Sequence, residues 1–341
     1  MRLLRALFAK PAAPASPDKV VIYRPVSLIG IGHFLFCAAI YGSLAREIGA
    51  RFIVTAKGTV FDIEDDGRRF LSEFLVPSWP SDLDVSIGHD AIRAALDNPR
   101  YDPTSAAIIG RLDARQRPPR EFPALQGVKV IDRWDDDAMR RPALADHGLI
   151  YADSVLPEAP LTKSLDRPSP MFDPHPRIVT QAQTAVPGDD YVAVHLRHGN
   201  GEHLHGRTEG GQAGFADYVD QVAERAMAEA AEAGLTRIVC LSDNFETAQQ
   251  LADKTGGVTL PPDDLPTRAH QKFLLDSPDN AVLDARLSRL LVDLTILGRA
   301  RRIVGGHSMF CHAAALWGDP GRLTLVAPDG ETAKFGEIPR T

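Results

Sequence analysis

Apolar residues along this chain fall into two kinds of pattern, and the two kinds alternate. Short apolar runs such as VVIY predict buried strands, whereas longer stretches with apolar residues three or four positions apart predict helices. In the first half, residues 20–23 predict a strand, 27–33 a glycine-containing loop, 34–48 a helix and 50–56 a second strand. This order predicts parallel strands joined by a right-handed crossover. Further strands are predicted at residues 105–110 and 128–132.

The second half repeats the pattern after a proline-rich stretch. Strands are predicted at 191–196, 237–242, 302–306 and 323–328, and helices at 215–233, 246–254, 283–300 and 309–317. Strands that alternate with helices of this length predict a parallel sheet. The proline-rich residues 157–187 are the best candidate for a linker, because proline lacks a backbone donor and disfavours helix in the preceding residue. We therefore expect two α/β domains, residues 18–178 and 188–341, with a cleft between them.

Composition and charge narrow the class of function. The 341 residues are 44% hydrophobic and 24% charged, which is typical of a globular protein. The net charge of −7 disfavours a nucleic-acid partner, since such proteins usually carry a basic face. An anionic small molecule remains open as a ligand, because a local group of Arg and His side chains can bind phosphate even on an acidic protein.

Cysteine content and hydropathy bear on the compartment. Cys37, Cys240 and Cys311 lie far apart in apolar contexts, so we expect buried free thiols, no disulfide framework, no zinc site and a cytoplasmic location. No apolar run reaches the roughly 18 residues that would indicate a transmembrane helix. The basic, amphipathic residues 1–10 leave two interpretations open, a frayed terminus or a weak membrane-surface contact.

Polar side chains gather where strands of the second half end, and open α/β sheets bind ligands at that edge. After the first of these strands, the segment VHLRHGNGE contains His195, Arg197, His198, Gly199 and Asn200. Glycine lets the backbone approach a ligand closely, and an arginine can bind a phosphate with two parallel hydrogen bonds. We interpret the segment as a ligand site, and the alternative is a surface loop with a structural arginine.

Two further strand ends carry polar groups, in the segments LSDN and GGHSMF. In the first, Asp243 and Asn244 lie between a strand and a helix, where ordinary N-caps are also common. The second opens a helix with Gly306, His307, Ser308 and Met309. A helix N-terminus offers unpaired N–H groups and a partial positive charge, which suits a diphosphate, although Ser308 could simply cap the helix.

Asp293 interrupts the apolar stretch LLVDLTIL. A carboxylate in an apolar place needs a donor partner. The paired N1–H and N2–H₂ edge of guanine would supply one, whereas uracil has no such pair of donors. An internal ion pair with Arg289 or Arg299 explains the residue equally well.

Taken together, these segments resemble the α-1,6-fucosyltransferases. HLRHGNG (195–201) resembles the first donor-binding motif of that family, and CLSDN (240–244) resembles the second. VDLTILGRARRIVGGHSMF (292–310) resembles the third region, and SLIGIGHFLF (27–36) resembles the glycine-rich opening of the same enzymes. The order and spacing of the segments extend the resemblance from about residue 20 to residue 317.

The resemblance implies two Rossmann-like domains in a GT-B-like fold. It implies a GDP-sugar donor, GDP-L-fucose, held mainly by the C-terminal half, and an oligosaccharide or glycolipid acceptor on the N-terminal half. Transfer would invert the anomeric centre, with neither a metal nor a cofactor. The implied donor-binding residues are His195, Arg197, His198, Gly199, Asn200, Asp243, Asn244, Asp293, Gly306, His307, Ser308 and Met309. The implied acceptor-side residues are Gly30, Gly32 and His33.

The resemblance also implies individual roles. Arg197 would neutralise the β-phosphate of the leaving group, and Asp293 would read guanine. Two positions depart from the family pattern, since His198 stands where eukaryotic members have a second arginine and Met309 follows Ser308 where a polar residue is frequent.

Inverting transfer needs a base for the acceptor hydroxyl and positive charge beside the departing diphosphate. Glu202 is the expected catalytic base, with His203 and His205 as rivals. Arg197 and the helix N-terminus at Ser308 would replace a metal, because the D-x-D letters at residues 82–84 lie in no donor-like context. A GT-B transferase with another nucleotide-sugar, or a non-catalytic nucleotide- or glycan-binding protein of the same fold, remains an alternative.

Overall fold

The structure is a computed structural model that describes most of the chain. The described residues are 19–25, 29–57, 59, 68–98, 101–110, 122–132, 135–153, 159–166, 168–198, 212–261, 279–306 and 308–337.

The first half of the chain forms a six-stranded sheet in which every neighbouring pair is parallel. The strands lie in the order β4-β2-β1-β7-β5-β6. Their bounds are β1 Val20–Arg24, β2 Arg51–Val54, β4 Val85–Ile87, β5 Ala106–Gly110, β6 Lys129–Asp132 and β7 Leu149–Asp153. The predicted parallel pairing of the first two strands is confirmed, with Val20 opposite Arg51 and Tyr23 opposite Val54.

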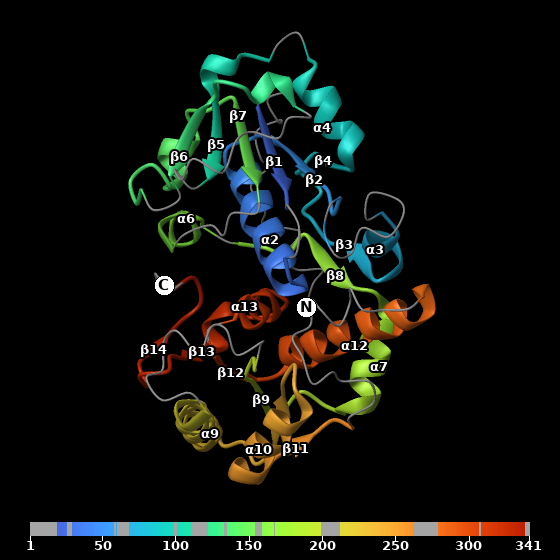
Figure 1. Ribbon diagram of the computed structural model, residues 1–341, viewed down its shortest axis with the longest axis vertical. Helices are drawn as coiled ribbons and strands as arrows, with labels where there is room; N and C mark the ends of the chain where they lie inside the picture. The colour runs from blue at the N-terminus through green and yellow to red at the C-terminus, as the bar shows by residue number, and fades with distance from the viewer. Residues whose placement is uncertain are drawn as a thin grey trace.

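The second half forms another six-stranded sheet, in the order β11-β10-β9-β12-β13-β14. All its pairs are parallel except β13 with β14, which is antiparallel. The strands are β9 Val192–His195, β10 Ile238–Leu241, β11 Val258–Thr259, β12 Arg302–Gly306, β13 Leu323–Val326 and β14 Thr332–Ala333. A small antiparallel pair, β3 (Leu75–Pro77) with β8 (Phe172–Pro174), lies between the two halves in Figure 1.

Helices cover both sheets, as Figure 1 shows. The described helices are α2 Ile31–Glu47, α3 Arg68–Glu73, α4 His89–Leu96, α5 Arg141–Leu144, α6 Ala159–Ser164, α7 Pro176–Ala185, α9 Gln212–Ala233, α10 Phe245–Thr255, α12 Asn280–Arg299 and α13 Met309–Leu316. Three 3-10 turns, η1 Pro103–Ser105, η2 Pro123–Leu125 and η3 Pro320–Arg322, complete the described elements. Alternation along β9 separates two layers: Val192 and Val194 pack with α9, while Tyr191 and Ala193 pack in the core that contains α12 and α13.

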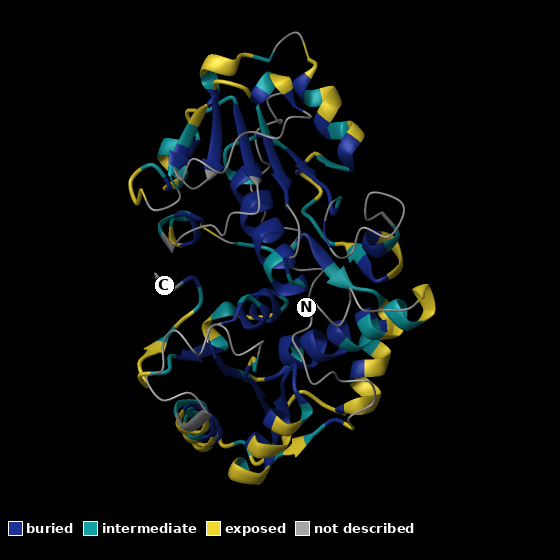
Figure 2. Cartoon of the chain, viewed as in Figure 1, coloured by how far each residue is buried: buried dark blue, intermediate teal, exposed yellow. Residues whose placement is uncertain are grey.

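One hydrophobic core joins the two halves. It contains α2 of the first half and α12 and α13 of the second, which are the dark central helices of Figure 2. Trp317, just after α13, donates its indole N–H to the carbonyl of Phe172 at 2.8 Å and so ties the second half to β8. The exposed helix faces lie on the outer side of each half (Figure 2).

The described end of the chain returns to the first half. Phe335 packs its ring 5.9 Å from that of Phe36 on α2, and Glu337 forms a 3.2 Å ion pair with Lys163 on α6. Gly336 has φ +79°, and a Cβ there would lie 2.9 Å from Thr162 Cγ2, so this crossing favours glycine.

The predicted α/β class with parallel sheets is confirmed, and some local predictions were wrong. Residues 157–187 are not a plain linker, because they contain α6, β8 and α7. Pro176 occupies the first turn of α7, a position where its missing N–H costs no helical bond, and α7 packs on α12. The domain limits at residues 178 and 188 therefore stay predictions. None of the described helices is long and apolar enough to cross a membrane.

Candidate functional site

The strand ends predicted to carry the site lie side by side. β9 is flanked by β10 and β12, and His195 at its carboxyl end is level with Leu241 on one side and Gly305 on the other. All three strands run parallel, so the residues that follow them leave the sheet at one edge. The structure thus brings together three segments that are 46 and 64 residues apart in sequence, counted from His195 to Leu241 and from Leu241 to Gly305.

Asp243 connects the first two segments. Its carboxylate is 2% exposed, and Oδ1 accepts a hydrogen bond from the backbone N–H of His198 at 2.6 Å. Oδ2 lies 4.0 Å from Nε of Arg197, whose side chain is 44% exposed. Among the described residues the terminal nitrogens of Arg197 have no hydrogen-bond partner.

The ring of His198 points into the protein between two helices. Nδ1 lies 3.0 Å from the hydroxyl of Thr247 on α10, and the ring meets Phe215 of α9 edge-on at 4.9 Å. Ser242 donates its hydroxyl to the carbonyl of Leu196 at 2.7 Å. His198 therefore packs as part of the protein framework on this side of the site.

Asn244 caps α10, which is the alternative weighed for it from sequence. Its side-chain oxygen accepts from Thr247 N at 3.0 Å, and its own N–H donates to Ser242 Oγ at 3.1 Å. The residue is 7% exposed. Its side chain is thus engaged within the protein, as expected of an N-cap.

Ser308 caps α13 in the same manner, with its hydroxyl 3.2 Å from Phe310 N. The ring of His195, 2% exposed, packs against that of Phe310, with centroids 4.8 Å apart and planes tilted by 31°. A Cβ on Gly306 would lie 2.6 Å from the Tyr218 hydroxyl oxygen, so packing alone accounts for a glycine here. The N-terminus of α13 stands at the sheet edge beside β9.

The three acceptor-side residues lie at the start of α2, close to the N-terminus of α13. A Cβ on Gly32 would stand 2.5 Å from Cα of Phe310 and 2.9 Å from the carbonyl carbon of Met309. Gly30, the N-cap of α2, has no atom within 4 Å of a Cβ built on it, and His33 is half-buried in the first turn of the helix. Two helices from different halves of the chain therefore begin within contact of each other.

Asp293 is buried on α12, where its carboxylate is 3% exposed and Oδ1 accepts from Arg289 Nε at 3.1 Å. Arg289 also donates to the carbonyl of Pro261, which follows β11. Burial raises the pKa of Asp293 to about 6, although Arg289 opposes this shift. The internal ion pair considered from sequence is present, so a guanine would share this carboxylate with Arg289.

Several predicted residues lie outside the described part of the chain. They are Gly199, Asn200, Glu202, His203, His205 and His307. Their roles, including that of Glu202 as the base, stay predictions.

The site also contains residues that sequence reasoning did not single out. Ser242, Thr247 and Phe310 hold the backbone or rings of the predicted residues in place. Ser242 lies within the LSDN segment and Thr247 lies three residues after it, so a search for hydrogen-bonding side chains around each predicted cap would have found them. Phe310 gave no such signal, because its importance arises from packing across the chain.

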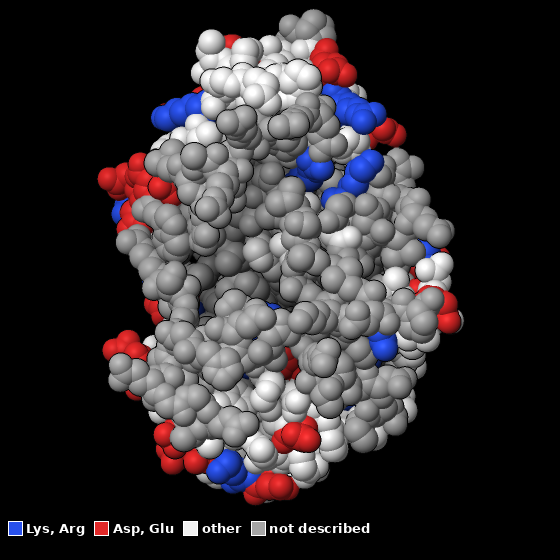
Figure 3. Space-filling view, viewed as in Figure 1, with Lys and Arg blue, Asp and Glu red and all other residues white. Residues whose placement is uncertain are grey.

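The D-x-D letters lie away from these strand ends, in the turn before β4. Asp82 accepts three hydrogen bonds from Arg46 at 3.0–3.1 Å, and Asp84 lies 3.7 Å from Arg51 Nε. Both carboxylates thus pair with arginines of the first half. Over the described surface in Figure 3, charges of both signs are interspersed, and no large basic patch is visible on that face.

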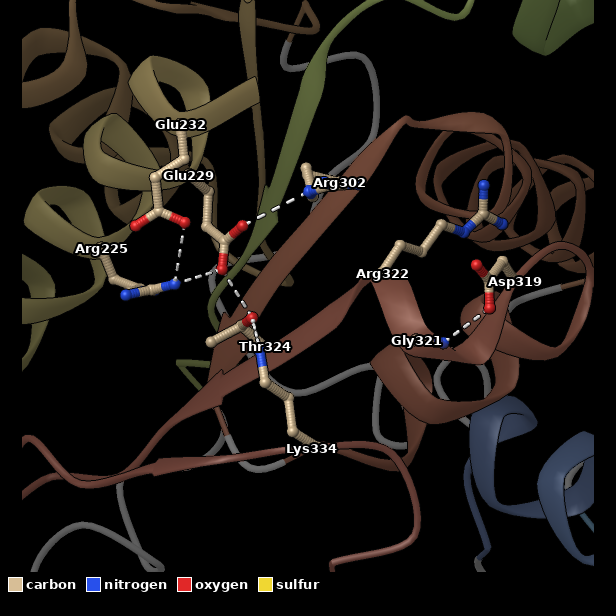
Figure 4. A pocket seen from close by; sticks show the side chains of 9 residues that line it. All are labelled: Arg225, Glu229, Glu232, Arg302, Asp319, Gly321, Arg322, Thr324 and Lys334. Atoms are coloured by element: carbon tan, nitrogen blue, oxygen red, sulfur yellow. Dashed lines mark hydrogen bonds and ion pairs between the residues drawn. The ribbon is translucent and has the colours of Figure 1, made fainter. Parts of the chain in front are cut away.

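A polar pocket of about 380 Å³ lies beside the amino ends of β12 and β13, at the opposite end of the second sheet from the predicted site (Figure 4). Buried Glu229 of α9 accepts hydrogen bonds from Arg225 at 2.5 Å and from Thr324 at 2.7 Å, and lies 3.5 Å from Arg302. Lys334 donates to the same threonine hydroxyl at 2.7 Å. The charged side chains that line the pocket thus pair with one another, and these interactions link α9 to β12, β13 and the residue after β14.

Similarity to known proteins is found among solved structures. No protein-family model matches the chain, and no curated protein matches its sequence. Among solved structures it is similar to NodZ α-1,6-fucosyltransferase from a crystal soaked with GDP-fucose, at 15% identity over 93% of this chain and 99% of that one, with a TM-score of 0.52. Selenomethionine NodZ from Bradyrhizobium matches at the same identity and TM-score over 93% and 98% of the two chains.

This likeness extends over nearly the whole chain. Identity of 15% shows the fold alone. The chain has the GT-B α/β fold of the fucosyltransferase NodZ, as the resemblance of its motifs predicted.

Proposed function

We propose that this protein is a metal-independent, inverting glycosyltransferase that transfers L-fucose from GDP-fucose to a glycan acceptor. One observation carries the proposal: Arg197, whose side chain is 44% exposed, follows β9 at the same end of the sheet at which α13 begins after the neighbouring strand β12, in a fold similar to that of NodZ α-1,6-fucosyltransferase. Positive charge and helix N–H groups at one edge suit a diphosphate leaving group.

The proposed donor site extends along this edge of the second sheet. Arg197 would bind the β-phosphate through its terminal nitrogens, and the first turn of α13 after Ser308 would face the phosphates. Asp293 would accept the two guanine donors. The acceptor would approach from the start of α2, near Gly30 and His33, because this helix begins against α13.

The proposed chemistry needs no protein group beyond a base and the cationic edge. Glu202 would take the proton from the acceptor hydroxyl as the new glycosidic bond forms, while the bond to the diphosphate breaks. Charge on the departing GDP would be stabilised by Arg197 and by helix N–H groups, in place of a metal ion. A cytoplasmic location is proposed because Cys37, Cys240 and Cys311 are buried free thiols.

The ion pair between Arg289 and Asp293 favours a second candidate, a GT-B transferase with a different nucleotide-sugar. Because Asp293 already has a partner inside the protein, it can be satisfied without guanine. A thermal shift with GDP, UDP and ADP separates the two candidates. Stabilisation by GDP alone supports the guanine-specific proposal, whereas equal stabilisation by all three overturns it.

Activity is tested by release of GDP from GDP-fucose, with and without a panel of oligosaccharides as trial acceptors. Arg197→Ala should lower turnover at least tenfold, because an ionic hydrogen bond to the leaving group is worth about 1.5–3 kcal/mol. Arg301→Ala is the matched control, since Arg301 is an exposed arginine paired with Asp190 away from the site. Equal turnover in the two variants would remove Arg197 from the mechanism. A wild-type protein that binds GDP but releases none from GDP-fucose would be a binding protein.

A further inference from the structure

Asp243 was predicted to contact the donor, but its surroundings indicate another role. Its carboxylate is almost fully buried, and both oxygens point toward the exit of the neighbouring strand β9. Oδ1 accepts the short 2.6 Å bond from His198 N and lies 3.4 Å from the hydroxyl of Ser242. A carboxylate placed against a diphosphate would also be repelled by it. These facts favour an interaction with the protein over one with the donor.

The approach of Arg197 to Asp243 determines which end of the guanidinium is available. The contact is made through Nε, at 4.0 Å from Oδ2. An arginine held at Nε still presents its two terminal nitrogens, which is the edge that binds a phosphate with two parallel hydrogen bonds. The side chain of Arg197 is 44% exposed, so it is not enclosed by the protein.

Neighbouring residues fix Asp243 in turn. Ser242 bonds the carbonyl of Leu196, and Asn244 caps α10, so the residues on both sides of Asp243 are anchored. Thr247, in the first turn of α10, holds the ring of His198. The strand exit that carries Arg197 is thereby tied to the start of α10 at several points, with Asp243 at the centre.

We propose that Asp243 is a positioning residue that orients Arg197 toward the β-phosphate of the donor and does not itself touch the donor. This inference rests on the proposed function. An arginine without this partner would sample several rotamers and lose orientation as well as affinity. The effect of Asp243 should therefore be confined to ligands that carry a β-phosphate and should require Arg197.

The test compares GDP with GMP, which lacks the β-phosphate, by calorimetric titration of the full chain. Asp243→Asn should weaken GDP binding about tenfold or more and leave GMP binding within about twofold. In an Arg197→Ala background the same substitution should change GDP affinity by less than about twofold, because the group it orients is gone. Asp253→Asn on the exposed side of α10 is the control for loss of one carboxylate and should change neither affinity.

The outcomes separate this inference from the proposed function. Equal losses for GDP and GMP, or a full loss in the Arg197→Ala background, would show that Asp243 acts on the fold or on the donor directly and would overturn the inference. Should Asp243→Asn fail to fold, Asp243→Glu serves instead, since it keeps the charge but displaces it, and the same contrast between GDP and GMP is expected. If wild-type protein binds no GDP, the proposed function fails and this inference fails with it.

Discussion

Gly32 and Phe310 bring the two halves of the chain into backbone contact at the candidate site. The first lies in the opening turn of α2 and the second in that of α13, and a Cβ on Gly32 would come within 2.6 Å of both N and Cα of Phe310. Backbone atoms cannot rotate away as a side-chain end can. The two helix N-termini can therefore approach this closely only because residue 32 has no side chain.

Gly32→Ala should destabilise the protein by about 1–3 kcal/mol, as an inserted methyl group does in a packed core, despite the higher helix propensity of alanine. It should also weaken GDP binding, because α13 must shift to make room. Urea unfolding and calorimetric titration measure the two effects. Gly30→Ala is the matched control, since no atom lies within 4 Å of a Cβ there and only a capping cost of at most about 1 kcal/mol is expected. Equal losses in the two variants would contradict the packing explanation.

Sequence periodicity predicted the four central strands of the second sheet, β10, β9, β12 and β13, but not the two-residue outer strands β11 and β14. The predicted strand at 302–306 matches β12, and the helix predicted at 215–233 lies within α9. These elements combine long amphipathic helices with continuous apolar strands, so the local signal agrees with the fold. That the polar residues after β9, β10 and β12 lie close together could be predicted because the three strands are parallel.

Other elements could not be predicted from local pattern. The three-residue strand β4 is too short to show a period, and β7, which lies beside β1 at the centre of its sheet, was not recognised. α2 begins at Ile31 and includes Gly32, although glycine disfavours helix, because contact with Phe310 requires it. The sequence alone cannot identify the partner of Asp293, since an i,i+4 arginine and a ligand both satisfy a buried carboxylate.

The buried carboxyl of Asp293 should make stability depend on pH. Burial raises its pKa to about 6 in the folded state, against 3.8 ordinarily, so the folded protein binds the proton more tightly. The Asp293 contribution to the free energy of unfolding is therefore fully present below about pH 4 and is lost as the pH rises through 6. The total loss is roughly 3 kcal/mol. The free energy of unfolding of Asp293→Asn relative to wild type should accordingly rise between pH 5 and pH 7.5. Urea unfolding at both pH values checks this, and a constant difference would contradict it.

GDP affinity should depend on the same proton if Asp293 accepts guanine donors. Only the ionised carboxylate accepts both hydrogen bonds. At pH 5, one unit below the raised pKa, about one carboxyl in ten is ionised, so GDP should bind about tenfold more weakly there than at pH 7.5. Calorimetry in buffers of different ionisation heat would detect the proton released on binding near pH 5.5. A GDP affinity independent of pH, with no proton release, would contradict the guanine role of Asp293.

Glu229 should stabilise the second sheet without affecting the donor site. Burial alone would raise its pKa, but hydrogen bonds from Arg225 and Thr324 outweigh burial and lower the pKa below its ordinary value. Its contribution to stability is thus present above the ordinary pKa and is lost as the pH falls toward the lowered one. Glu229→Gln should cost about 3 kcal/mol at pH 7, since it leaves Arg225 and Arg302 without a buried counter-charge.

The control for Glu229→Gln is Glu232→Gln on the same helix, because the Glu232 side chain is 62% exposed and lies 3.8 Å from Arg225. It should change the unfolding free energy by less than about 1 kcal/mol. Neither variant should alter the dissociation constant for GDP by more than about twofold, because the pocket lies at the opposite end of the sheet from Arg197. Urea unfolding at pH 7 and at pH 3.5, below the ordinary pKa of 4.5, should show the deficit of Glu229→Gln shrinking at the lower pH. A deficit that grows as the pH falls would show that the Glu229 carboxyl is held protonated in the folded protein, against the lowered pKa that its arginine partners impose.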